Sequence, residues 1–346
     1  MKKPGLLAAI ALSFPTVAAA QAVGADAHAA SSTRRMHIKL ATDKIVPVPI
    51  ERVKGMMILP GMVAGKRANI LFDTGTDVTL VDERLMRDQG LTVRPIKGGL
   101  NTGLSVMTTG VVDTTMALGD ALKLDGSFVA TDLGAMSRAL GIPIAAVMGE
   151  DSMAPFVIVI DPIRNRMAFG LPGHVDVTMH ANMPGQAAAK VKGDSSPPAN
   201  IVPKFVTFDA NFAVESEING EPCRLLVDYG HSGAVTLSDK VWDRVMSGIG
   251  DAARHSGATR SDGQRYDSRV KTADQVRVGD ISARDVPVGS GPPPGRDGVD
   301  GMLGLGILAS SVTVLNMPKK QLWFFPMGQE VSVKVPQSDT PAEARK

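Results

Sequence analysis

The chain has 346 residues, of which 44% are hydrophobic, and it carries 37 basic against 35 acidic residues. A chain of this length can bury one large core or the cores of two ordinary domains. The near balance of charge argues against the basic face that nucleic-acid binding needs, so we expect no nucleic-acid partner.

The first twenty residues have the pattern of a secretory signal peptide. Lys2 and Lys3 form a charged start, residues 6–17 an apolar middle, and residues 18–20 a small-residue cleavage site. A retained membrane anchor is disfavoured because the apolar stretch is short, and no later segment reaches the ~20 apolar residues of a spanning helix. We therefore expect residues 1–20 to be a cleaved signal peptide and the protein to be periplasmic or secreted, without a membrane span.

The segment that follows, residues 21–35, is rich in Ala and Ser and predicts a flexible N-terminus. β-prone runs with prolines come next, at residues 45–50 and 56–60, and these prolines fit edge strands better than central ones. Residues 64–66, Ala-Gly-Lys, then predict a hairpin turn.

An acid ends the strand that follows this turn. The apolar run 70–72 leads into Asp73, and Thr74, Gly75 and Thr76 come directly after it. An acid placed after buried strand residues is costly unless partners hold it, and the glycine permits a sharp turn towards a cleft. The pattern predicts a functional carboxylate.

The same order occurs a second time. Residues 219–220, Asn-Gly, predict a hairpin turn, and the apolar run 225–227 leads into Asp228, Tyr229 and Gly230. Each acid is followed by a Val-Thr-Leu run, at 78–80 and at 235–237, and then by a short helix with an N-terminal cap near Asp82 and near Ser238.

Two later glycines keep the same spacing as the acids. Gly149 and Gly304 each follow an apolar run and lie 155 residues apart, as do Asp73 and Asp228. Equal spacing at two independent landmarks indicates a tandem duplication.

The repeat divides the chain into segments. We expect an N-terminal lobe at residues 36–170, a linker at 171–200, a C-terminal lobe at 201–326 and a disordered tail at 327–346. Inside each lobe a Gly-rich or polar stretch indicates either a mobile hairpin or an ordinary loose one. The first contains Gly98, Gly99, Asn101 and Gly103, and the second spans residues 255–269.

Other chemistries lack their motifs. The six histidines are scattered without a His-Glu-x-x-His pattern, so we expect no metal site and no cofactor. Cys223 is the only cysteine, which excludes an intramolecular disulfide, and its apolar strand predicts a small buried side chain rather than a nucleophile.

The chain resembles the retropepsin and pepsin aspartic proteases in three features. These are the motif Asp-Thr-Gly-Thr behind an apolar run, a hairpin after it, and a later apolar-apolar-Gly. The chain is most similar to bacterial retropepsin-like proteins that carry both halves in one chain, over roughly residues 55–170 and 205–326. The resemblance implies a mainly β, two-lobed acid-protease-like fold, with two β-barrel-like lobes, short helices and a central cleft. The Gly-rich hairpins would be flaps over a bound peptide.

The resemblance also implies an aspartic endopeptidase. Asp73 and Asp228 would meet at the floor of the cleft, share one proton and activate a water that attacks an extended peptide or protein substrate. The supporting residues carried over from the motifs are Thr74, Gly75, Thr76, Tyr229, Gly230, Gly149 and Gly304. The resemblance implies that the Thr74 hydroxyl bonds across to the other lobe and that the Thr76 hydroxyl bonds the acid. Because one chain supplies both acids, we expect a monomer.

The second copy departs from the pattern at two positions. Tyr229 stands where the family has a threonine whose hydroxyl bonds across to the other lobe, and tyrosine is too bulky for that contact without rearrangement. His231 is either an ordinary loop histidine or a pH-sensitive neighbour of the acids. The alternative function is therefore a catalytically inactive, peptide-binding protein of the same fold.

Overall fold

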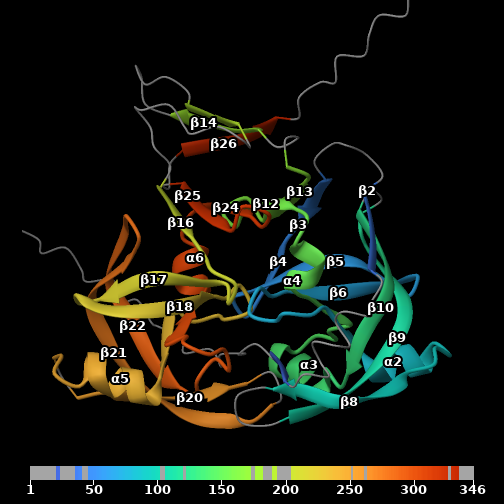
Figure 1. The fold of residues 1–346 in the computed structure, drawn as a ribbon, viewed down its shortest axis with the longest axis horizontal. Helices are drawn as coiled ribbons and strands as arrows, with labels where there is room; N and C mark the ends of the chain where they lie inside the picture. Colours follow the sequence, from blue (N-terminus) through green and yellow to red (C-terminus); the bar gives the residue numbers. More distant parts are fainter. Residues whose placement is uncertain are drawn as a thin grey trace, which may run out of the picture.

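The structure is a computed structural model that describes residues 21–23, 36–40, 46–101, 106–119, 122–172, 176–181, 189–192, 204–250, 252–260, 263–325 and 329–334. The expected signal peptide lies outside these residues. The fold is mainly β, with two lobes side by side below a sheet that joins them (Figure 1), which confirms the predicted fold class.

The N-terminal lobe contains a closed six-stranded barrel. Its strand order is β9-β10-β7-β11-β6-β5, and β5 pairs with β9 to close the ring. Ala64 and Gly65 both have positive φ in the β5–β6 turn, as the sequence predicted for a hairpin. The strands are β5 (Met56–Val63), β6 (Lys66–Phe72), β7 (Leu80–Asp82), β9 (Val106–Leu118), β10 (Leu122–Thr131) and β11 (Ala146–Met148).

The C-terminal lobe contains a second barrel with the same order. The ring runs β21-β22-β19-β23-β18-β17 and is closed by pairing of β17 with β21. Asn219 and Gly220 supply the positive φ values of its β17–β18 turn. The strands are β17 (Ala213–Ile218), β18 (Glu221–Val227), β19 (Val235–Ser238), β21 (Arg265–Val278), β22 (Ile281–Gly291) and β23 (Gly301–Leu303).

A six-stranded sheet joins the two lobes. Its centre is the antiparallel pair β12–β24, in which Val159 lies opposite Val314. These two valines are also 155 residues apart, so an approximate two-fold axis passes between them. The order is β16 (Lys204–Thr207), β25 (Gln321–Phe325), β24 (Val312–Asn316), β12 (Val157–Asp161), β13 (Arg166–Gly170) and β3 (Val46–Pro49). The prolines of β3 lie at the edge of this sheet, as expected.

Further strands extend the barrels. On the N-terminal barrel they are β4 (Glu51–Val53), β8 (Arg94–Asn101), β2 (Met36–Leu40) and β1 (Gln21–Val23), and on the C-terminal barrel β20 (Arg254–Thr259). β1 pairs with β8, so this part of the segment expected to be flexible forms a strand.

A small third sheet contains residues that the sequence placed in a linker and a disordered tail. It consists of β15 (Ala189–Lys192), β14 (Asp176–Ala181) and β26 (Gln329–Lys334). For these residues the expectation of unpaired chain does not hold. Val331 and Val333 alternate with polar residues, which is the period of a strand, but the polar composition of the tail concealed it.

Five short helices complete the described fold: α2 (Glu83–Asp88), α3 (Gly134–Leu140), α4 (Glu150–Met153), α5 (Asp239–Met246) and α6 (Leu305–Leu308). The Asp82 side chain caps α2 by accepting from Leu85 N–H (2.8 Å), as predicted. Ser238 precedes α5 at the expected position but makes no side-chain cap bond. Within the described part of the chain, no helix has the length and apolar character needed to cross a membrane.

Candidate active site

The two acids lie at equivalent places in the two barrels. Asp73 follows β6 and donates its N–H to Met148 O at the end of β11 (3.2 Å). Asp228 follows β18 and donates its N–H to Leu303 O at the end of β23 (2.9 Å). Each barrel therefore positions one acid at the carboxyl ends of two parallel neighbouring strands.

Each acid is held by its own turn. Gly75 N–H donates to Asp73 Oδ1 (2.8 Å), and Gly230 N–H donates to Asp228 Oδ1 (2.7 Å). Both carboxyls are buried, with 2% of Asp73 and none of Asp228 exposed. The apolar lead-in and the tight turn act as the sequence predicted.

The two carboxyls are in hydrogen-bond contact with each other across the lobes. Gly230 lies directly against Asp73: a Cβ at Gly230 would come within 2.2 Å of Asp73 Cγ. Only a residue without a side chain permits this approach.

Burial and proximity set the charge of the pair. Burial raises the pKa of Asp73 to about 6, against the opposing effects of the Gly75 N–H, Asp228 and Arg296. Burial, and then the charge of Asp73, raise the pKa of Asp228 well above its usual range. Asp228 Oδ2 is buried and accepts from no donor among the described residues. The arrangement suits two carboxyls that share one proton.

Thr74 links the lobes from one side. Its hydroxyl donates to Val227 O (2.7 Å) and accepts from Tyr229 N–H (3.1 Å), both in the other lobe. Tyr229 is fully buried and its ring lies edge-on to Phe72, with centroids 5.6 Å apart. The Tyr229 hydroxyl shares a hydrogen bond with Thr313 Oγ1 on β24 (2.5 Å). The larger residue is accommodated because its hydroxyl reaches the joining sheet.

Thr76 and His231 occupy the same position after each acid. The Thr76 hydroxyl, expected to bond the acid, donates instead to Val78 O (3.2 Å), and its backbone N–H contacts Asp73. His231 is buried, with Nε2 3.0 Å from Thr236 Oγ1, and burial lowers its pKa to about 4. His231 lies in the loop between β18 and β19, as a loop histidine, and its imidazole is buried and neutral.

The paired glycines lie behind the acid loops. A Cβ at Gly149 would come within 2.5 Å of the Val78 carbonyl, and one at Gly304 within 2.4 Å of Gly233 O. Any other residue at either position would push the acid turn out of place.

Arg296 is a site residue that sequence reasoning missed. It lies in the loop between β22 and β23, and only 7% of its side chain is exposed. Its Nη2 donates to Glu150 Oε1 (2.6 Å) and to Asp77 in the other lobe, and Nη1 donates to Asn211 O (2.5 Å). Burial raises the pKa of Glu150 to about 7, and Arg296 opposes this rise. Its sequence context has no motif that indicates burial against acids.

The hairpins expected to be flaps are partly described. Gly98, Gly99 and Asn101 lie in β8, which pairs with β9, whereas Gly103 falls outside the described residues. In the other lobe, residues 255–259 lie in β20 and residues 265–269 in β21, which pair antiparallel with Thr259 opposite Arg265, whereas residues 261–262 fall outside the described residues.

Cys223 is buried, and burial raises the pKa of its thiol to about 11, which makes it a poor nucleophile. Among the described residues, no group of His, Cys, Asp and Glu side chains has the arrangement of a metal site.

Two six-stranded barrels, each presenting a buried acid to the other, are the arrangement of an acid-protease-like fold. In agreement with this, the model of the aspartyl protease family matches residues 214–307, the part of the C-terminal lobe that contains Asp228. That region is therefore similar to the aspartyl protease family. No curated protein shows significant similarity to the chain.

Proposed function

We propose that the protein is an aspartic endopeptidase in which Asp73 and Asp228 activate the attacking water. The observation that carries this proposal is the contact between two buried carboxyls from different lobes, with raised pKa values. The family match at residues 214–307 supports the hydrolase class.

The proposed chemistry needs only the pair and a water. The charged carboxyl takes a proton from the water as its oxygen attacks the peptide carbonyl, while the protonated carboxyl donates to the developing oxyanion. The tetrahedral intermediate then breaks its C–N bond as the leaving nitrogen receives a proton. One carboxyl ends protonated and the other charged, so the pair is ready for another cycle.

The substrate in this proposal is an extended peptide or protein segment lying between the lobes. Such a segment would pair its backbone with strand edges of the β8–β9 and β20–β21 hairpins, while its side chains alternate between pockets. We also propose that the repeated strand order reflects a tandem duplication, which would allow a monomer to form the whole site.

The test is cleavage of a mixed peptide library by the chain without residues 1–20, read by mass spectrometry. We expect wild-type protein to cut, and Asp73→Asn and Asp228→Asn to lose cleavage. In each variant an amide replaces one of the two carboxyls, so the proton can no longer be exchanged between the acids, the water and the peptide. Asp274→Asn, an exposed acid on β21, is the matched control and should cut normally. Equal cutting by wild type and Asp73→Asn would overturn the proposal.

The second candidate is a peptide-binding protein without turnover, and Tyr229 is the observation that favours it. Its hydroxyl bonds Thr313, so Thr74 alone supplies the cross-lobe side-chain hydroxyl of this motif. This candidate predicts saturable peptide binding by wild-type protein together with no product. Product formation that depends on Asp73 would exclude it.

We further propose delivery to the periplasm or outside the cell through a signal peptide at residues 1–20. Expression of the full chain followed by fractionation and N-terminal sequencing tests this. Full-length protein retained in the cytoplasm would contradict it.

A further inference from the structure

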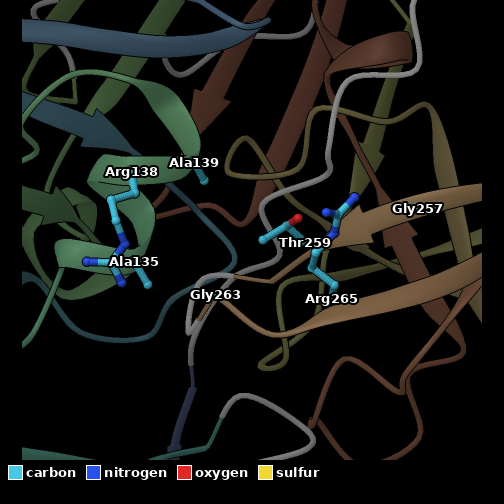
Figure 2. A pocket seen from close by; sticks show the side chains of 7 residues that line it. All are labelled: Ala135, Arg138, Ala139, Gly257, Thr259, Gly263 and Arg265. Atoms are coloured by element: carbon cyan, nitrogen blue, oxygen red, sulfur yellow. The ribbon is translucent and has the colours of Figure 1, made fainter.

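A cavity of about 530 Å³ lies between the two lobes, away from the two acids' own turns. One wall is α3 of the N-terminal lobe, and the other is the β20–β21 hairpin of the C-terminal lobe (Figure 2). Its lining residues are Ala135, Arg138, Ala139, Gly257, Thr259, Gly263 and Arg265.

Small residues keep this cavity open. α3 contributes the methyl groups of Ala135 and Ala139, and the hairpin contributes Gly257 and Gly263, which have no side chains. The hairpin approaches α3 closely: a Cβ at Gly263, which has a φ of +84°, would come within 2.8 Å of Ala135 Cβ. The cavity is thus lined from both lobes and open to solvent.

The lining has two positive charges and no negative one. Arg138 and Arg265 lie on opposite walls (Figure 2), and neither guanidinium forms an ion pair with the residues that the structure describes. Lys54 adds a third cation next to the helix, where its Nζ donates to Ala139 O (2.6 Å).

Two nearby acids already have partners. Asp132, which precedes α3, accepts from Arg84 Nη2 (2.8 Å) and from Gly134 N–H (2.7 Å). Asp267 on the hairpin contacts His255 Nδ1 (2.5 Å). The guanidinium groups of the cavity therefore remain available to an anionic ligand.

We propose that this cavity is a specificity subsite for a Glu or Asp side chain of the substrate, an inference that rests on the proposed endopeptidase function. A carboxylate is the chemistry that two guanidinium groups recognise, through charge-assisted and bidentate hydrogen bonds. The alanine methyls would contact the CH₂ groups of the same side chain. The volume falls in the range of small-ligand sites and accommodates such a side chain with part of its backbone.

The test compares two peptides that differ only in Glu against Gln at one position near the cleaved bond, chosen from the cleavage products of a library. We expect wild-type kcat/KM to favour Glu by about ten- to a hundred-fold, the range of charge-assisted bonds. Arg138→Met combined with Arg265→Met should bring the ratio of kcat/KM for the Glu peptide over the Gln peptide down to about one. Arg284→Met, an exposed arginine on β22, is the matched control.

The outcomes separate this inference from the proposed function. If wild-type protein cuts both peptides equally, or if the double variant keeps the Glu preference, the subsite assignment is wrong while the endopeptidase stands. If no peptide is cut, the endopeptidase falls, and fluorescence anisotropy with a library peptide compared in its Glu and Gln forms decides the subsite. Glu-selective binding that is lost in the double variant supports it, and equal binding overturns it.

Discussion

Replacement of Tyr229 tests how the second copy tolerates its departure from the family pattern. Tyr229→Phe removes one hydroxyl and leaves the buried Thr313 hydroxyl without its partner, which costs about 1–3 kcal/mol. Tyr229→Thr also removes the ring that packs on Phe72, and large-to-small replacements of this kind cost about 3–5 kcal/mol. We therefore expect the family-like threonine to be the more destabilising of the two.

The measurement is urea unfolding of wild type and both variants, compared by midpoint at constant slope. Tyr266→Phe is the control, because Tyr266 is partly exposed and water can replace a lost bond there. A Tyr229→Thr protein as stable as wild type, or one more stable than Tyr229→Phe, would refute this reasoning. Cleavage is assayed on the same samples: the endopeptidase proposal expects Tyr229→Phe to cut, whereas activity found only in Tyr229→Thr favours the peptide-binding alternative.

Three further changes probe the surroundings of the pair. Gly230→Ala would place a Cβ 2.2 Å from Asp73 Cγ, so we expect loss of cleavage, whereas Gly248→Ala, exposed and with open space around it, should cut normally; equal rates would contradict the close approach. Arg296→Met leaves two carboxylates without their buried counter-charge, and a loss of roughly 3–5 kcal/mol is expected in urea unfolding; an unchanged midpoint would show that the network contributes nothing. Because the folded pKa of Glu150 is about 7, above its ordinary 4.5, its contribution to stability is present below pH 4.5 and is lost as pH rises through 7. The stability of wild type relative to Glu150→Gln should therefore fall by about 3 kcal/mol over this interval, and a pH-independent difference would contradict the shift.

Local chemistry made much of the fold predictable from the sequence. The two hairpin turns were readable because Ala64-Gly65 and Asn219-Gly220 supply positive φ where the strands reverse. The equal spacing of the acids and glycines predicted two halves of the same construction, and the barrels have the same strand order. These features depend on a few neighbouring residues. The pairing of β12 with β24 agrees with the same spacing, because the paired residues Val159 and Val314 are also 155 residues apart.

The remaining parts of the site depend on contacts between residues far apart in the sequence. Arg296 is a loop arginine in the sequence, and only the docking of the two lobes places it beside Glu150. One difference is local: the Thr76 hydroxyl, expected to bond the acid, donates instead to the carbonyl of Val78, two residues ahead. The partner of Tyr229, Thr313, is 84 residues away. No local pattern specifies such pairs.

The two lobes hold their acids with different hydrogen-bond donors, and this difference affects how the two carboxyls share one proton. Asp73 receives the N–H groups of Gly75 and Thr76, which favour its charged form, and the charge of Arg296 lowers the pKa of both acids. Asp228 receives the Gly230 N–H, and its other oxygen is buried and accepts from no donor among the described residues. A charge shared by two acids resides mainly where more donors stabilise it. The additional N–H donor therefore favours the charged form of Asp73, and the two carboxyls titrate as a unit.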